Sequence, residues 1–422
     1  MPESPPFKAP IGTRDVLPPE SSRWIALLSA FARHAEGGGY GLVETPMLED
    51  AGVFQRVGEG TDIVRKEMYD FEDKGGRRLA LRPEVTASVV RAFVQHRPAT
   101  PWKVWTVMPC FRYEAPQAGR FRQHHQVDIE IFGTADPDAD VEVIAVGHDY
   151  LRRVGLRRVT LLLNSMGASD DRRAYIERLG AWLEERADRL DPDDRAKVAA
   201  NPMRVLDSKR KATREVTRDA PRILDHLSAE ARQRFERVQQ GLGDLDIDFI
   251  LEPRLVRGLD YYTHTTFEFV SEALDTAQST LLGGGRYDGL VAEMGGPPTP
   301  AIGWGSGIER VLLACDAEGV FPAPERGIDV FVVDVTGGAA ARAITAHLRR
   351  EGIRVDRAWD DRSMKAQMRR ANVSGARLAL IVGEKEVAES TVSVRDLRVD
   401  GAEQETVERG RLVEHVRKIL EG

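Results

Sequence analysis

The stretch 109–133 combines cationic and acidic side chains in an order that could carry out chemistry. It reads PCFRYEAPQAGRFRQHHQVDIEIFG, and its arginines occupy the segment between two strand-like runs. The arginines are Arg112, Arg120 and Arg122, and the runs span 103–108 and 127–132. Because the planar guanidinium group matches the geometry of phosphate, this segment is a candidate for binding a phosphorylated ligand.

The second run alternates apolar residues with polar ones, as a strand with two different faces does. The polar positions are His124, Gln126, Asp128 and Glu130. A polar strand face is usually solvated. Here, however, the same hairpin carries the arginines, and carboxylates suit an amine or an imidazole. The pattern therefore favours a site that holds a nucleotide phosphate beside a small cationic molecule.

A helix start upstream could contribute to this site. A short apolar strand at 79–81 meets Pro83, and a helix is expected from about Glu84 to Val94. Glu84 and Thr86 then lie at the helix N-terminus, where an acid caps the helix. Capping is the simpler interpretation, and contact with a ligand amine is the alternative.

Two glycine-rich runs follow later in the chain. The run 301–310, AIGWGSGIER, indicates a strand that passes into a helix, with Arg310 in the first helical turn, where it can face a ligand. The run 282–290, LGGGRYDGL, can form a loop that approaches a phosphate or a neighbouring backbone. It does not match the spaced glycines of a dinucleotide-binding fold.

Composition bounds the class of protein. The 422 residues suggest two or three domains, and 42% hydrophobic with 30% charged residues indicates a soluble, globular chain. No apolar run has the length of a signal peptide or a membrane span. Two cysteines exclude a disulfide framework and fit a reducing cytoplasm. With a net charge of −7, nucleic-acid binding has to come from local basic patches.

Periodicity predicts the elements that position these residues. A helix is expected to open at 18–20 and to end at the glycines 37–39. From about 169 to 245 apolar residues recur near every 3.6 positions, which predicts a helical insertion. Basic residues cluster within it, at Arg204, Lys209, Arg210, Lys211 and Arg214. Such a cluster is usually a solvated face, and contact with nucleic-acid phosphates is the second interpretation.

The last hundred residues have a different pattern. A proline-containing linker at 321–324 precedes alternating strand and helix patterns, which predict a small α/β domain. Residues 342–377 contain ten Arg or Lys against four Asp or Glu, a net charge of +6. Arg362, Lys365 and Arg369 are spaced to share one helix face, a candidate surface for a phosphate backbone.

These segments together resemble the class II aminoacyl-tRNA synthetases and, within that class, the histidyl-tRNA synthetase family over nearly the whole chain. Thr45-Pro46, the FRYE run at 111–114 and the GSGIER run at 305–310 look like the three class motifs. The runs 257–262, RGLDYY, and 284–287, GGRY, are similar to the motifs specific for histidine. The tail resembles the anticodon-binding domain of the family.

The resemblance implies an α+β catalytic domain at 1–325, with an antiparallel sheet of six or seven strands flanked by helices and interrupted by the insertion. An α/β anticodon-binding domain follows at 326–422. The implied activity is a histidine--tRNA ligase, which joins L-histidine to tRNA(His) through a histidyl-adenylate and releases AMP and pyrophosphate. ATP would be a substrate, with Mg²⁺ at its pyrophosphate portion and no metal site on the protein. The implied protein is a cytoplasmic homodimer that does not associate with a membrane.

The resemblance also assigns roles to residues. Arg112 and Arg257 would hold the α-phosphate as catalytic residues. Glu114 would read the adenine amine, Arg120 would reach the triphosphate tail, and Arg310 would stack on adenine or meet the distal phosphates. The residues expected at histidine are Glu84, Thr86 and Gln126 for the α-amino group, Glu130 and Tyr262 for the imidazole nitrogens, and Arg257 and Tyr261 beside them.

The chain departs from the usual pattern of the family at several positions. Ala115 stands in the second motif, where many bacterial relatives carry arginine, so weak recognition of the tRNA acceptor end is expected. The rival hypotheses are a regulatory paralogue that senses histidine, such as the regulatory subunit of ATP phosphoribosyltransferase, and a nucleotide-binding protein with an accessory domain. The first lacks the catalytic arginines and the tail. The second would not explain the histidine motifs.

Overall fold

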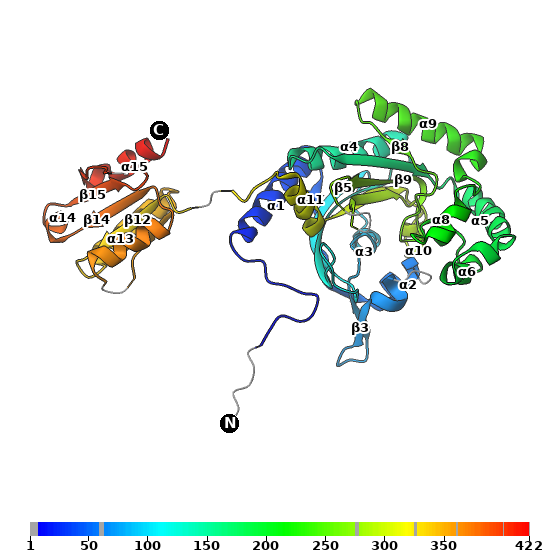
Figure 1. Ribbon diagram of the computed structural model, residues 1–422, viewed down its shortest axis with the longest axis horizontal. Helices are drawn as coiled ribbons and strands as arrows, with labels where there is room; N and C mark the ends of the chain where they lie inside the picture. The colour runs from blue at the N-terminus through cyan, green and yellow to red at the C-terminus, as the bar shows by residue number, and fades with distance from the viewer. Residues whose placement is uncertain are drawn as a thin grey trace. The chain divides into compact units, whose positions relative to one another are not determined.

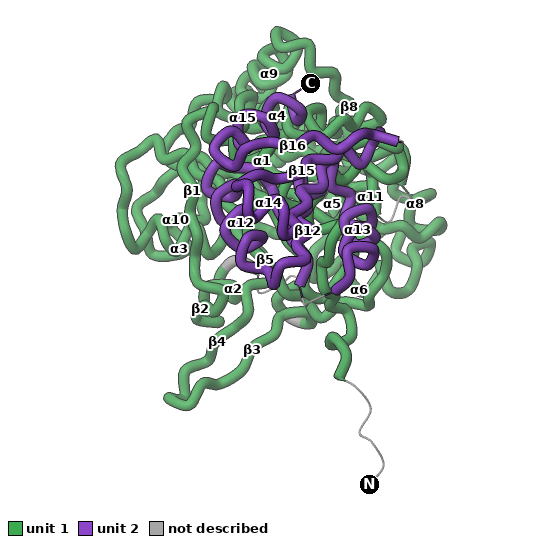
Figure 2. Tube along the Cα trace, turned by 90° about the vertical axis from the view of Figure 1, so that its left-hand side faces the viewer, with its two compact units in different colours: residues 1–323 green, residues 324–422 purple. Residues whose placement is uncertain are grey.

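The computed structural model describes residues 7–58, 63–274, 278–324, 327–359, 362–399 and 401–421 (Figure 1). The chain divides into two compact units, Met1–Ala323 and Pro324–Gly422 (Figure 2). The boundary expected between residues 325 and 326 lies outside the described residues. In the described part of the chain, no helix is long and apolar enough to cross a membrane.

Unit 1 is built on an eight-stranded sheet in the order β1-β5-β6-β11-β10-β9-β7-β8. The strands are β1 (Gly41–Leu42), β5 (Trp102–Phe111), β6 (Gln123–Phe132), β7 (Val159–Ser165), β8 (Ile250–Leu251), β9 (Thr263–Ser271), β10 (Thr280–Arg286) and β11 (Ala301–Gly307). The six inner strands pair antiparallel, as expected. The two short edge strands β1 and β8 pair parallel, which makes the sheet mixed and one strand larger than predicted.

Helices cover both faces of this sheet. One face packs against α1 (Glu20–Gly37), α4 (Pro137–Arg153) and α11 (Ile308–Glu318) in a core that includes Phe31, Tyr150 and Trp304. The other face packs against α2 (Ala51–Gly58), α3 (Thr86–His96) and α10 (Leu290–Glu293). A small sheet of β2 (Leu48–Asp50), β4 (Arg78–Leu81) and β3 (Tyr69–Glu72) lies beside α2.

The run 282–290 does not form the expected loop. Its first three glycines, 283–285, belong to the inner strand β10, where a Cβ atom on Gly284 would lie 2.1 Å from the Gly303 carbonyl oxygen of β11. The glycines therefore allow a neighbouring backbone to come close, which was one of the two roles expected for them. They do so within a strand and not in a loop.

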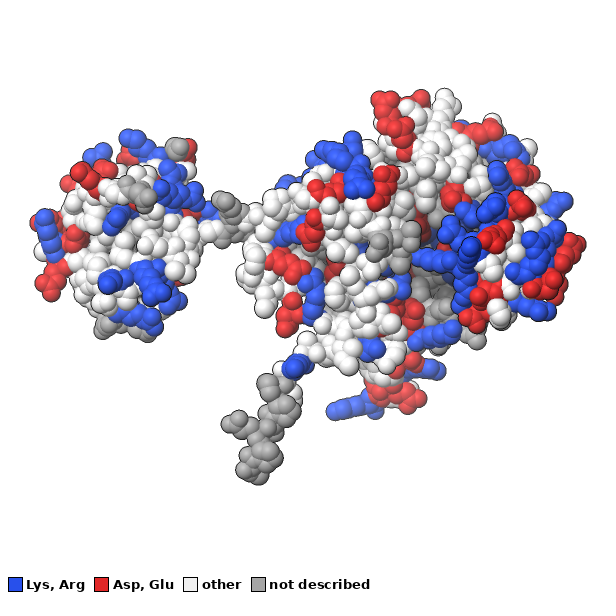
Figure 3. All heavy atoms as spheres, in the orientation of Figure 1, with Lys and Arg blue, Asp and Glu red and all other residues white. Residues whose placement is uncertain are grey.

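The segment predicted to be a helical insertion contains only helices among its described elements. They are α5 (Ser169–Glu184), α6 (Pro192–Val198), α7 (Met203–Leu206), α8 (Lys211–Thr217) and α9 (Ala229–Asp244). They share a core of their own that includes Tyr175, Leu179 and Val205. Figure 3 shows lysine and arginine side chains, mixed with acidic ones, over this part of unit 1.

Unit 2 has a five-stranded sheet in the order β13-β12-β14-β15-β16. Its elements are β12 (Val330–Asp334), α12 (Ala339–Arg350), β13 (Val355–Arg357), α13 (Met364–Val373), β14 (Leu378–Val382), α14 (Glu384–Ala388), β15 (Thr391–Asp396), β16 (Glu405–Glu408) and α15 (Leu412–Glu421). The predicted helix face is partly wrong, because Ser363 caps α13 and leaves Arg362 before the helix. Arg362 still lines one groove with Lys365 and Arg369.

Candidate active site

On the polar face of β6, Asp128 and Glu130 are buried and His124 and Gln126 are partly exposed, so the interpretation that this face is solvated is wrong for its carboxylates. Asp128 and Glu130 are 2% and 0% exposed, because β6 lies inside the sheet between β5 and β11. The apolar positions Val127, Ile129 and Ile131 point into the core beneath α1 and α4. The alternation predicted from the sequence is therefore correct, and its polar face lies on the side of the sheet covered by α3.

Glycines of β11 make room for these carboxylates. Glu130 lies opposite Gly303, and Asp128 lies opposite Gly305. A Cβ atom on Gly303 would lie 1.6 Å from Oε2 of Glu130, and one on Gly305 would lie 2.4 Å from Oδ1 of Asp128. A larger residue at Gly305 would displace the Asp128 carboxylate, and one at Gly303 would also meet the Ile129 carbonyl oxygen at 2.4 Å, which explains the glycines of this strand.

A cavity of about 300 Å³ opens beside this face. It brings together six of the residues predicted for the site, which are Arg112, Arg120, Gln126, Arg257, Tyr262 and Arg310. They come from the hairpin of β5 and β6, the segment before β9 and the first turn of α11. Four guanidinium groups around one cavity form a strongly cationic site suited to a polyphosphate.

Neighbouring groups hold three of these arginines in place. Arg112 donates from Nε to the Pro83 carbonyl oxygen at 2.7 Å. Arg310 donates from Nε to the Gly119 carbonyl oxygen at 3.1 Å. Arg257 forms a close ion pair with Glu268 of β9. The hydroxyl of Thr280 donates to the other oxygen of Glu268 at 3.0 Å, which fixes the carboxylate that orients Arg257.

Glu114 lies next to the cavity but does not line it. Its Oε2 is 2.8 Å from Nε of Arg120, and its Oε1 is 3.9 Å from a terminal nitrogen of Arg112. The carboxylate therefore neutralises part of the cationic wall in this structure. The loop that carries it turns tightly between Gln117 and Arg120, with Gly119 at a φ of +67°.

The other residues predicted for histidine form a second group next to the cavity. Glu130 accepts a hydrogen bond from the Thr86 hydroxyl at 2.7 Å, and its other oxygen accepts a close one from Tyr287. The rings of Tyr261 and Tyr262 lie 4.6 Å apart, and Tyr261 packs against Tyr287 at 5.5 Å.

Glu84 caps α3, as the simpler interpretation held. Its Oε1 accepts a hydrogen bond from the Ala87 backbone amide at 2.8 Å. Glu84, Thr86, Glu130 and Tyr261 do not line the cavity in this structure. They lie behind its wall, where Glu84 is 6% exposed.

Burial shifts the ionisation of these groups. It raises the pKa of Glu84 to about 7 and that of Glu130 to about 8. On the cationic side, burial and then the nearby Arg112 and Arg310 lower the pKa of His124 to about 3. His124 is therefore neutral near pH 7, and the buried carboxyls hold a substantial share of protons.

Comparison with known proteins identifies the family. Residues 12–311 match the family model for histidyl-tRNA synthetase, and residues 329–419 match the model for an anticodon binding domain. The chain belongs to the histidyl-tRNA synthetase family. A member from Moorella thermoacetica, a histidine--tRNA ligase, is 46% identical over 418 residues, which cover 98% of each chain.

Solved structures agree with this family and with its class II fold. The apo histidyl-tRNA synthetase of S. aureus superimposes with a TM-score of 0.82 at 35% identity and covers 97% of this chain and 99% of its own. An ATP phosphoribosyltransferase regulatory subunit/histidyl-tRNA synthetase from Bacillus halodurans C has a TM-score of 0.60 at 22% identity, covering 83% of this chain and 92% of its own. That second likeness establishes the fold alone.

Sequence reasoning assigned no role to four residues of this site. His124 and Glu268 line the cavity, and Tyr287 and Asp128 belong to the buried group. His124 and Asp128 had been placed on the polar strand face, and Tyr287 lies in the run 284–287, so the sequence carried a usable signal for these three. Glu268 lies in an unremarkable strand, and its pairing with Arg257 depends on the fold.

Proposed function

We propose that this protein ligates L-histidine to tRNA in two steps. The histidine carboxylate attacks the α-phosphorus of ATP and releases pyrophosphate, and a ribose hydroxyl at the tRNA 3′ end then attacks the histidyl-adenylate and releases AMP. The observation that carries the proposal is a cavity with four arginines beside a buried carboxylate face. Histidine-dependent exchange of pyrophosphate into ATP is the test.

Positioning and charge would supply most of the catalysis at the phosphate end. Arg112 and Arg257 lie on the hairpin side and on the β9 side of the cavity, where they could hold the α-phosphate between them. Arg310 would then stack on the adenine ring or bind the distal phosphates, and Arg120 would reach the triphosphate tail. Glu114 would accept a hydrogen bond from the adenine amine. ATP would enter as its Mg²⁺ complex, so that the metal arrives with the substrate.

The buried group would hold histidine. Glu84, Thr86 and Gln126 are proposed for the α-ammonium, and Glu130 and Tyr262 for the imidazole, with Arg257 and Tyr261 alongside. In this arrangement the substrate carboxylate points towards the arginines. A pocket that pairs both ring nitrogens would reject analogues without them by about 10⁴-fold, because unpaired buried polar groups are costly.

We expect Glu130→Ala and Tyr262→Phe each to raise the KM for histidine far more than the KM for ATP. Each removes one buried hydrogen-bonding partner of the ligand, which costs about 1–3 kcal/mol and corresponds to a rise of about 5- to 150-fold. The measurement is pyrophosphate exchange with each substrate varied in turn. A change confined to ATP would place these residues at the nucleotide instead.

The assembly and location of the enzyme are also inferred. Leu42, Met47 and Leu48 flank Thr45 and are 57%, 43% and 43% exposed. Exposed apolar side chains around Thr45 fit a homodimer contact of the first class motif. Charging of tRNA would take place in the cytoplasm.

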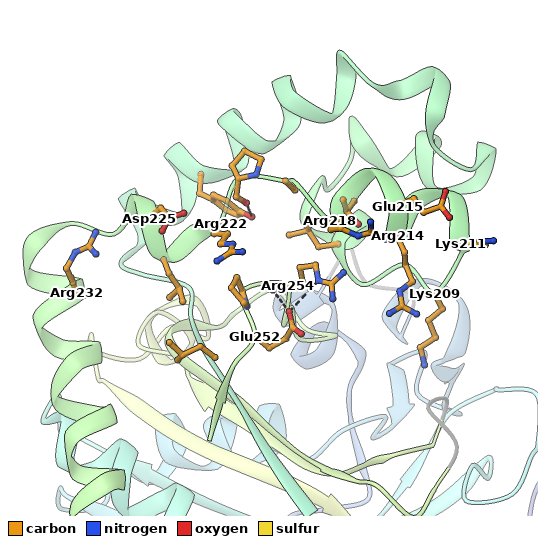
Figure 4. Close-up of a pocket in the computed structure, with 18 residues that line it drawn as sticks. Lys209, Lys211, Arg214, Glu215, Arg218, Arg222, Asp225, Arg232, Glu252 and Arg254 are labelled. Carbon is orange, nitrogen blue, oxygen red and sulfur yellow. Dashed lines mark hydrogen bonds and ion pairs between the residues drawn. The ribbon is translucent and has the colours of Figure 1, made fainter. Parts of the chain in front are cut away.

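The insertion is proposed to contact tRNA through a cationic cavity of about 900 Å³ (Figure 4). The basic residues that line it are Lys209, Lys211, Arg214, Arg218, Arg222, Arg232 and Arg254, against three acids, Glu215, Asp225 and Glu252. Arg254 pairs with Glu252 at 3.4 Å. Within the described residues, no ion pair is found for Arg214, Arg218 or Arg222, which leaves these cations for phosphate.

The double variant Arg214→Gln/Arg218→Gln is expected to raise the KM for tRNA and to leave pyrophosphate exchange unchanged. Each lost phosphate contact lowers the slope of log affinity against log salt by about 1, so a change of about 2 is expected. The matched control is Arg77→Gln/Arg78→Gln, at the end of the turn after β3 and at the start of β4, where each arginine has an acidic partner. If the two double variants raise the KM for tRNA equally, the insertion has no special role in binding tRNA.

The rival hypothesis of a regulatory paralogue shares the fold but is not favoured by the residues of the site. The present chain differs from the expectation for that paralogue in having Arg112, Arg257 and Arg310 around one cavity and a second unit that matches the anticodon-binding family. Exchange activity would separate the two functions, since a sensor binds histidine without turning over ATP.

A further inference from the structure

Asp128 is a buried acid for which neither the sequence nor the comparisons provides a role. It lies on the same face of β6 as Gln126 and Glu130 and is 2% exposed. The hydrogen bond found for its carboxylate comes from the Thr106 hydroxyl at a long 3.5 Å. Oδ1 of Asp128 and Nε2 of Gln126 approach the same point above Gly305, at 2.4 and 2.7 Å from where its Cβ would lie.

Asp128 is one of three buried carboxyl groups at this end of the site. The others are Glu84, 6% exposed, and Glu130, which is fully buried. None of the three forms an ion pair among the residues that the structure describes. Buried carboxylates without a cation are unfavourable, so such a group either keeps protons or awaits a positive ligand.

We propose that Asp128 is a third carboxyl group of the histidine pocket, and that this group of three gives up a proton when the α-ammonium of histidine binds. The inference rests on the proposed function, because the ammonium is that of the histidine substrate. Asp128 would act on the ammonium directly or through Gln126, whose amide lies beside it and lines the cavity.

The proton balance is simple. The empty pocket holds a carboxylic acid, and histidine binds as a zwitterion that brings its ammonium group. The acid then becomes a carboxylate paired with that ammonium, and its proton goes to the buffer. No covalent bond of histidine changes in this step. The substrate carboxylate remains free to face the arginines of the cavity.

The groups that face Asp128 favour this behaviour. Burial, followed by Glu130 and Glu84, raises the pKa of Asp128 well above its ordinary value, while Thr106 and Arg82 lower it to a smaller extent. Cys110, on β5, is a buried neutral thiol whose pKa is raised by burial. An ammonium would lower the pKa of the carboxyls, so protons are released between the pKa of the bound pocket and that of the empty one.

Calorimetric titration of histidine into the full-length protein, near pH 7, in phosphate and in Tris, counts the protons released. For the wild type we expect roughly one proton per histidine, falling as the pH rises above about 8, where Glu130 is already ionised. Asp128→Asn should release fewer protons and bind histidine about tenfold more weakly, because it keeps the shape and loses the acid. Thr106→Val keeps the acid and should keep the release.

The outcomes separate the two ideas. Wild-type protein that binds histidine with no proton release overturns the inference and leaves the proposed function standing, whereas wild-type protein that binds no histidine contradicts the proposed function itself. An Asp128→Asn variant with wild-type affinity and proton release removes Asp128 from the pocket. If that variant does not fold, as judged by thermal unfolding, Asp128→Gly replaces it with the same expectations.

Discussion

Arg257→Ala is expected to lower pyrophosphate exchange by about 10²–10³-fold while the protein remains folded, because it removes one preorganised cationic donor from the reacting phosphate. Arg257 projects into the cavity over Gly283 and is held there by Glu268, so its position is fixed before ATP binds. A donor that is fixed in advance stabilises developing charge without reorganising.

Two controls make this result interpretable. Arg173→Ala removes an exposed arginine of α5 that pairs with Asp170 on the same helix, and it should leave exchange unchanged. The loss of Arg257 also leaves Glu268 as a half-buried acid without its cation, so thermal unfolding of Arg257→Ala must be measured beside its activity. Near wild-type exchange in a folded Arg257→Ala variant would refute the assignment.

Ending the chain after Ala323 is expected to preserve pyrophosphate exchange and to reduce aminoacylation of tRNA severely, because the unit that matches the anticodon-binding family, with its basic groove beside α13, is lost. The cavity and the buried carboxyls lie in unit 1, which has its own cores. The shortened protein should still sediment as a dimer, since the exposed residues Leu42, Met47 and Leu48 are retained.

A matched variant distinguishes lost charge from a lost domain. Full-length protein with Lys365→Gln and Arg369→Gln keeps the fold of unit 2 and removes two cations from the groove beside α13. Its aminoacylation should fall less than that of the shortened protein and should respond less steeply to salt. Unchanged charging of tRNA by the shortened, folded protein would show that unit 2 plays no part.

The sequence predicted those features that depend on local pattern. Alternation in β6 identified the face that carries Gln126, Asp128 and Glu130, because side chains in a strand alternate wherever the strand lies. The same alternation could not tell a solvated face from a buried one. That depends on β6 pairing with β5 and β11, and β11 is separated from it by some 170 residues of sequence.

The predictions from the sequence that were wrong also have physical causes. Glycine is depleted in strands, so the run at 282–290 resembled a loop, yet close contact between β10 and β11 requires those glycines. Arg362 was placed on a helix because its spacing fitted, although Ser363 is a strong N-cap signal and its hydroxyl accepts from the Ala366 amide at 3.4 Å. The pairing of Arg257 with Glu268 could not be read from spacing, since the fold alone brings them together.

The most direct test of the central claim is pyrophosphate exchange by the wild-type protein with each of the twenty amino acids in turn. The proposed function predicts exchange with histidine and background rates with the other nineteen, because the buried carboxyl and tyrosine groups require a ligand that pairs with them. Exchange with a different amino acid, or none with any of the twenty in a folded protein that binds ATP, would contradict it.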